Sequence, residues 1–122
     1  MTLLKTGRKV RPFLDVPETE VALGAYDNGA IAIMGFAGED EWYCASVRLA
    51  ETRRVLQDNE VWLKGWSENE GLPAALEAAG IVTRTGITTR FGYASAELAL
   101  VDEKLMELWR AHQVELEEEA SP

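Results

Sequence analysis

Hydrophobic and polar positions alternate most clearly between residues 20 and 36. Two runs with apolar residues at every second position, Glu20–Tyr26 and Ala30–Phe36, flank the turn sequence Asp27-Asn28-Gly29. Asn-Gly tolerates the positive φ angles that a tight hairpin turn requires. The pattern therefore predicts a β-hairpin of which one face packs against the rest of the protein.

Segments further along the chain continue the β pattern. Residues 38–41 form a polar turn, and Trp42–Leu49 after it is rich in the aromatic and β-branched residues that strands favour. This run is predicted to be the third strand of an antiparallel meander. Further strands are predicted at Val61–Trp66 and Tyr93–Val101, and residues 81–90 are either a strand or an extended loop.

A short helix is predicted after residue 66. Ser67 and Glu70 have the spacing of a capping box, in which the hydroxyl accepts a first-turn N–H and the carboxylate reaches back. Pro73 is tolerated only within the first turn, which favours a start near Asn69. Gly80 is expected to end the helix.

A second helix is predicted over residues 102–119, with Asp102 as its cap. Its apolar residues recur with i, i+3 and i+4 spacing, so they are expected to form one packed stripe. The run Glu117-Glu118-Glu119 places acids at the negative end of the helix dipole, where fraying is expected. The stripe consists of Leu105, Leu108, Trp109, His112 and Leu116.

These elements predict an α+β fold in a single domain of residues 1–122, as the length and the hydrophobic content of 47% suggest. An antiparallel sheet of about four to six strands, arranged as a meander, is expected to pack against one or two helices. Residues 1–19 contain Gly7, Pro12 and Pro17 and are expected to be an irregular basic segment.

Charge is divided unevenly along the chain. The first eleven residues contain four bases and no acid, whereas the remainder contains all 21 acids and the other 8 bases. A body this acidic repels nucleic acid and attracts basic surfaces, which are typical of proteins that hold nucleic acid. The expected partner is therefore a basic nucleic-acid-binding protein surface, with no direct contact to nucleic acid.

Candidate catalytic chemistry is sparse. Cys44 is the only cysteine, which excludes an intramolecular disulfide, and its apolar surroundings in the sequence favour a buried thiol. His112 is the only histidine, and a metal site would require further His or Cys ligands. We predict that the protein is not an enzyme and uses no cofactor or metal. A small hydrolase that pairs Cys44 with His112 is the open alternative.

The sequence also allows a prediction of the cellular compartment. No stretch approaches the ~18 apolar residues of a membrane span. Bases between Lys5 and Arg11 interrupt the apolar residues that a secretory segment would need at the start. A cytoplasmic protein without membrane contact is expected.

Three segments together resemble a known group of proteins. They are the hairpin at residues 27–33, the run Trp42–Val47, and the block W-S-E-N-E-G-L-P-A-A-L-E-A-A-G-I-V at Trp66–Val82, which Thr85-Gly86 follows. In order and spacing they are similar to small proteins of unknown function that phages, plasmids and integrated elements encode. The resemblance covers about residues 20–100 and assigns no binding residue. It implies an accessory protein of a mobile element, a class that includes anti-CRISPR and anti-restriction inhibitors.

Acidity and resemblance together suggest a DNA mimic, because carboxylates on rigid elements can imitate the phosphate charge of a duplex. The hypothesis is an anti-CRISPR protein that binds a CRISPR effector subunit stoichiometrically and blocks target DNA binding. Trp66, if exposed beside two glutamates, would be an interface anchor. The predicted partner-binding residues are Glu39, Asp40, Glu41, Trp66, Glu68, Glu70, Glu107, Glu115, Glu117 and Glu118.

Plainer explanations exist for the same residues. Glu68 and Glu70 also suit the start of a helix, residues 39–41 suit a polar turn, and residues 117–119 suit a solvated tail. The alternative function is a homo-oligomeric structural module of a phage or plasmid. In that case the last helix would pair with its copy in a homodimer through Leu105, Leu108, Trp109 and Leu116.

Overall fold

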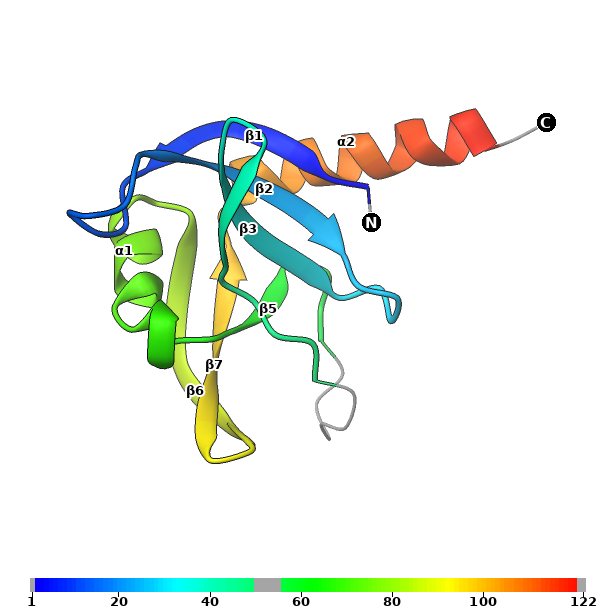
Figure 1. The fold of residues 1–122 in the computed structure, drawn as a ribbon. Coiled ribbons are helices and arrows are strands. Elements are labelled where there is room, and N and C mark those ends of the chain that lie inside the picture. Colours follow the sequence, from blue (N-terminus) through cyan, green and yellow to red (C-terminus); the bar gives the residue numbers. More distant parts are fainter. Residues whose placement is uncertain (1, 50–55, 121–122) are drawn as a thin grey trace.

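The computed structural model describes residues 2–49 and 56–120. Within these ranges the strands form two antiparallel sheets, which two α-helices and a short 3-10 helix accompany (Figure 1). The first sheet has the order β1-β2-β3-β4 and the second the order β5-β7-β6. The strands are β1 (Leu4–Val10), β2 (Thr19–Ala25), β3 (Ile31–Ala37), β4 (Asp40–Cys44), β5 (Glu60–Leu63), β6 (Val82–Phe91) and β7 (Ala94–Val101). The helices are η1 (Ser67–Asn69), α1 (Leu72–Ala78) and α2 (Glu103–Ala120).

The predicted α+β class is confirmed, and so is the meander. β2 and β3 pair in the register expected for a hairpin, with Leu23 opposite Ile33 and Ala25 opposite Ile31. The Tyr26 N–H donates to the carbonyl of Ala30 at 2.8 Å, which closes the Asn-Gly turn. The division of the strands between two sheets is a feature that the alternation pattern did not predict.

The prediction that residues 1–19 are irregular is wrong for β1. This strand pairs with β2, where Leu4 lies opposite Leu23 and Val10 opposite Thr19. The register shifts between Lys5 and Lys9, and this irregularity explains why the sequence lacks a simple alternation. The bases are tolerated because β1 is an edge strand, on which Lys5 and Lys9 are exposed and the half-buried Arg8 pairs with Asp102.

The two sheets join just beyond β4. The predicted strand Trp42–Leu49 ends at Cys44, but Ser46 forms an isolated bridge with Leu63 of β5. The Lys64 N–H donates to the Ala45 carbonyl at 2.8 Å, and the Val47 N–H donates to the Trp62 carbonyl at 2.9 Å. The main chain therefore passes from the edge of one sheet to the edge of the other.

The capping box predicted at Ser67 and Glu70 does not form. Ser67 begins the 3-10 helix without making a side-chain cap, and α1 begins only after Gly71. Gly71 has a φ of 83°, a left-handed conformation that glycine adopts without a Cβ penalty. Pro73 then lies within the first turn of α1, where its missing N–H costs nothing.

One core holds both sheets and both α-helices together. It contains Leu23 and Ile33 of the first sheet, Leu63 of the second sheet, and Leu76 of α1, each of them fully buried. α2 contributes Leu105, Met106 and Trp109. Its predicted stripe is wrong at Leu108, which is 48% exposed, because Met106 takes the inward position instead.

Candidate partner-binding surface

The first group of predicted acids lies at the β3–β4 turn. Glu39 is in the turn, Asp40 and Glu41 begin β4, and all three side chains are exposed. Within the described residues none of the three forms an ion pair. Lys5 lies near the turn, since its Nζ donates to the Gly38 carbonyl at 3.1 Å. These carboxylates therefore face solvent beside one base of the N-terminal strand.

The second group surrounds Trp66, which follows β5 directly. Trp66 is half-buried and packs against the small apolar cluster of Trp62, Ala96 and Leu98. The expectation that Trp62 and Trp66 share one strand is wrong, because β5 ends at Leu63. The main chain turns there, so the Trp62 ring is buried while the Trp66 ring reaches the surface.

A lysine lies over the Trp66 ring and pairs with a glutamate. The Lys64 Nζ lies 5.9 Å from the ring centroid and 2.5 Å from the Glu68 Oε1. Glu68 is therefore engaged within the molecule, unlike the acids of the β3–β4 turn. Glu70, which ends η1, is exposed and has no ion pair among the described residues.

The hydrogen bond from Lys64 lowers the pKa of the Glu68 carboxyl to about 2. Since the folded-state pKa is depressed below the unfolded value, the pair favours folding at neutral pH and loses this effect as pH falls through that pKa. We expect Lys64→Met to return the pKa of Glu68 toward its ordinary value near 4.5. A ¹³C NMR titration of the carboxyl measures this directly. An unchanged titration in Lys64→Met would show that the lysine is not the cause.

Two grooves meet at Trp66. One, of about 460 Å³, has Trp42, Cys44, Lys64 and Glu68 in its walls. The other, of about 500 Å³, lies between the α1 start at Pro73 and the β6–β7 hairpin, where its walls include Tyr93, Arg84 and Glu97. Trp66 lines both grooves and separates them.

Sequence reasoning missed two exposed aromatic residues beside these grooves. Trp42 is 50% exposed, although it begins an apolar run, and Tyr93 at the hairpin tip is fully exposed. The sequence signal for their exposure is the preceding residue, which is the acidic Glu41 before Trp42 and the turn residue Gly92 before Tyr93. Exposed aromatic side chains at the rim of a groove are typical of protein-binding surfaces.

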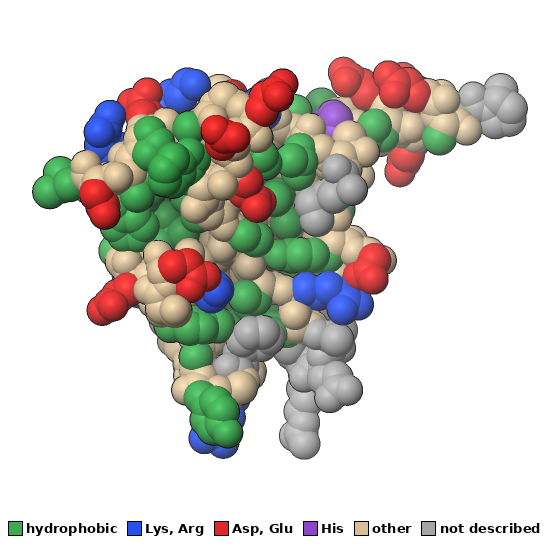
Figure 2. Space-filling view, viewed as in Figure 1, with side chains coloured by type: hydrophobic (Ala, Val, Ile, Leu, Met, Phe, Trp, Pro, Cys, Tyr) green, Lys and Arg blue, Asp and Glu red, His purple; other side chains and the backbone are tan. Residues whose placement is uncertain are grey.

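The third group of predicted acids lies on α2. Glu107, Glu115, Glu117 and Glu118 are exposed, and the distal half of α2 projects away from the sheets (Figure 1). Figure 2 shows acidic side chains along this projecting half and others spread over the upper part of the body. Glu39–Glu41 and Glu68 therefore lie close to the sheets, whereas Glu115, Glu117 and Glu118 lie on the projecting half of α2 (Figure 1).

Two of the four α2 residues predicted to form a dimer contact are not at the surface. Leu105 and Trp109 belong to the protein's own core and are not free to contact a second copy. Leu108 and Val114 remain exposed, and Leu116 is half-buried. The exposed apolar side chains of α2 are therefore Leu108 and Val114, rather than Leu105 and Trp109.

The structure gives Cys44 and His112 separate surroundings. The Cys44 Sγ lies 3.5 Å from the Ser46 carbonyl and 3.8 Å from the Tyr26 hydroxyl. Burial raises the pKa of Tyr26 to about 12. The His112 ring lies against Trp109 on α2, with 5.9 Å between the ring centroids. The described contacts of Cys44 thus provide no histidine base.

Comparison with known proteins identified no matching family, no similar curated protein and no similar solved structure. Within residues 2–49 and 56–120, no three His, Cys, Asp or Glu side chains are placed to hold a metal ion. No helix in this described part is long and apolar enough to cross a membrane.

Proposed function

We propose that the protein is an inhibitor encoded by a mobile element, an anti-CRISPR protein that binds a CRISPR effector subunit and blocks its binding of target DNA. The observation that carries this proposal is the cluster Glu39–Glu41, whose exposed carboxylates have no ion pair within the described residues. A turn and the start of a strand hold these charges on a defined framework. The net charge of −9 supports the same proposal.

The pattern of ion pairs explains why this cluster is singled out. Several other acids are neutralised locally, as by the pairs Arg84–Glu97 at 2.6 Å and Arg8–Asp102 at 3.0 Å. Arg110 pairs with both Asp58 and Glu103. Acids that keep their charge unpaired retain the full attraction for a cationic cleft. Binding would then compete with DNA and weaken as salt is raised.

The experiment measures target-DNA binding by a reconstituted CRISPR effector in the presence of the purified protein. We expect stoichiometric inhibition that the triple variant Glu39→Lys/Asp40→Lys/Glu41→Lys weakens by about tenfold or more, since charges at an interface rim govern association. The variant Glu115→Lys/Glu117→Lys/Glu118→Lys tests the α2 group in the same way. The matched control is Asp15→Lys/Glu18→Lys/Glu119→Lys, which makes the same change in net charge at other exposed positions.

Each result has a defined meaning. Equal loss in the control and in both test variants would show that net charge alone matters and would contradict a defined acidic surface. Unchanged DNA binding by effectors of several types, without complex formation, would refute the proposal. Light scattering on the same preparations reports self-association, and a dimer that Leu108→Glu dissociates would favour the homo-oligomeric alternative.

A further inference from the structure

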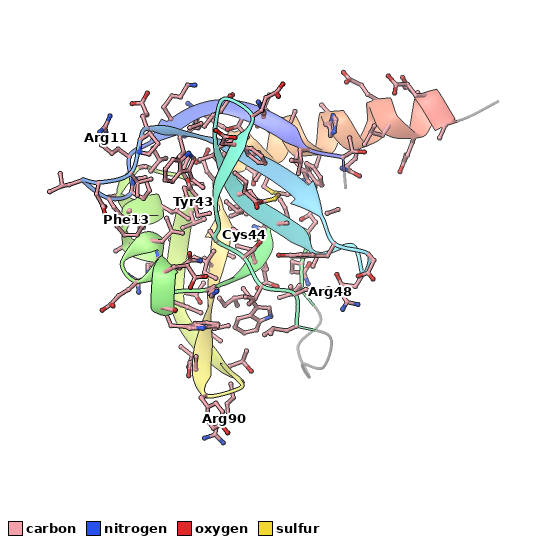
Figure 3. The ribbon with its side chains drawn as sticks, viewed as in Figure 1. Arg11, Phe13, Tyr43, Cys44, Arg48 and Arg90 are labelled. Atoms are coloured by element: carbon pink, nitrogen blue, oxygen red, sulfur yellow. The ribbon has the colours of Figure 1, made fainter. Side chains whose placement is uncertain are left out.

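The groove of about 460 Å³ beside Trp66 is bordered by the edge of a β-strand. Trp42, Tyr43 and Cys44 all line it, although they are consecutive residues of β4. A strand face presents only alternate residues, so three in succession indicate that the strand edge forms the wall. The Tyr43 ring lies over Gly35, and its hydroxyl lies 3.1 Å from that of Thr19, so Tyr43 borders the groove through its backbone. Figure 3 labels Tyr43 and Cys44 in this part of the structure.

The edge of β4 is open over only part of its length. β4 is the last strand of its sheet and pairs with β3 on one side. Beyond it, Ala45 and Val47 bond to the segment around β5, and the Asn69 Nδ2 donates to the Cys44 carbonyl at 2.7 Å. Within the described residues no strand pairs with the outer edge of residues 40–43. This short stretch, in which Trp42 is the extra residue of a register shift between β3 and β4, therefore offers the backbone groups on either side of Trp42 to an added strand.

The opposite wall of the groove carries a cation of its own. The Lys64 Nζ lies 5.9 Å from the Trp66 ring centroid and 2.5 Å from the Glu68 carboxylate. Lys64 thus already occupies the face of Trp66 and neutralises Glu68, so the unpaired negative charge beside the groove is that of Glu39–Glu41. Trp42, which is 50% exposed, supplies a second ring on the strand side, next to the acids Glu39–Glu41.

We propose that this groove binds an extended basic segment of the partner, which pairs with the β4 edge and places arginine or lysine side chains against Trp42 and the neighbouring acids Glu39–Glu41. The inference rests on the proposed function, because the basic segment would be the part of the proposed partner that this protein binds. Charge selects this occupant over a second copy of the chain. A second β4 edge would bring its own Glu39–Glu41 against the first, and like charges on paired strands repel.

The test uses a synthetic probe, an acetylated and amidated octapeptide in which arginine and valine alternate. Calorimetry measures its affinity, and ¹H–¹⁵N spectra report which amides respond. We expect shifts at residues 40–43 and at the indoles of Trp42 and Trp66. The same peptide N-methylated at its six interior amides keeps every charge but loses the backbone donors. We expect it to bind at least about tenfold more weakly, as one lost interaction of ~1.4 kcal/mol implies.

Two variants of the protein test where the peptide binds. Trp42→Ala is expected to weaken the peptide by about fivefold or more, because it removes one exposed aromatic wall without opening the core. Tyr93→Ala is the matched control, since Tyr93 is an exposed aromatic that lines the other groove. Equal affinity of the two peptides would overturn strand pairing, and equal loss in the two variants would overturn the location.

The outcomes of this inference and of the proposed function are separable because the peptide assay contains no effector. A protein that inhibits an effector but does not bind the peptide refutes the groove assignment alone. A protein that binds the peptide at residues 40–43 but leaves every effector unchanged supports the groove and refutes the inhibitor proposal.

Discussion

Replacing Gly35 with alanine is expected to lower the free energy of unfolding by about 3 kcal/mol, the upper part of the range for overpacking a core. Gly35 lies opposite Tyr43 across the β3–β4 pair. A Cβ at position 35 would lie 2.1 Å from the Tyr43 Cζ, far inside any permitted contact. The ring has little room to move, because it is buried and its hydroxyl is 3.1 Å from that of Thr19.

Urea denaturation with linear extrapolation measures this loss. The control is Gly38→Ala, where nothing lies within 4 Å of the added Cβ and only the positive φ of 64° opposes the substitution. That variant should lose about 1 kcal/mol. If Gly35→Ala is no less stable than Gly38→Ala, the Tyr43 ring does not occupy the space over Gly35.

Trp109→Ala is expected to cost about 3–5 kcal/mol, the usual range for removing a large aromatic side chain from a core. Trp109 is only 8% exposed and, with Leu105 and Met106, attaches α2 to the two sheets. No other described part of α2 contributes to this core. The substitution should therefore release the helix as well as destabilise the sheets.

Far-ultraviolet circular dichroism during thermal unfolding reports both effects. Leu108→Ala is the matched control, because Leu108 is next to Trp109 in sequence but is 48% exposed, so its replacement should change stability by less than about 0.5 kcal/mol. Equal destabilisation by the two substitutions would mean that α2 turns a different face to the core. It would also mean that Leu108 packs against the core, as the apolar spacing in the sequence predicts.

The local sequence pattern was sufficient to predict those strands that pair with their neighbours along the chain. The β2–β3 hairpin follows from apolar alternation on either side of Asn28-Gly29, and pairing needs no information from the rest of the chain. β1 could not be predicted in this way. Its partner Leu23 lies nineteen residues away along the chain, and its bases are compatible with a strand only at a sheet edge.

The candidate surface was predicted in part. Trp66 and Glu68 were identified from the sequence, but their contact with Lys64 depends on the chain turning after Leu63. Trp42 was predicted to begin the third strand of the meander. It is 50% exposed at the point where the β3–β4 register shifts, so that it lies opposite no residue of β3, and only the strand pairing defines this shift.

The sequence by itself determined the α+β class, the meander, the acidic character of the body and the short helix ended by Gly80. These follow from interactions over a few residues or from charge, which is the same in any fold. The tertiary structure decided which acids are paired, which edge of β4 is open and which tryptophan reaches the surface. Each of these depends on segments distant in sequence packing around one core, and a local pattern does not contain that information.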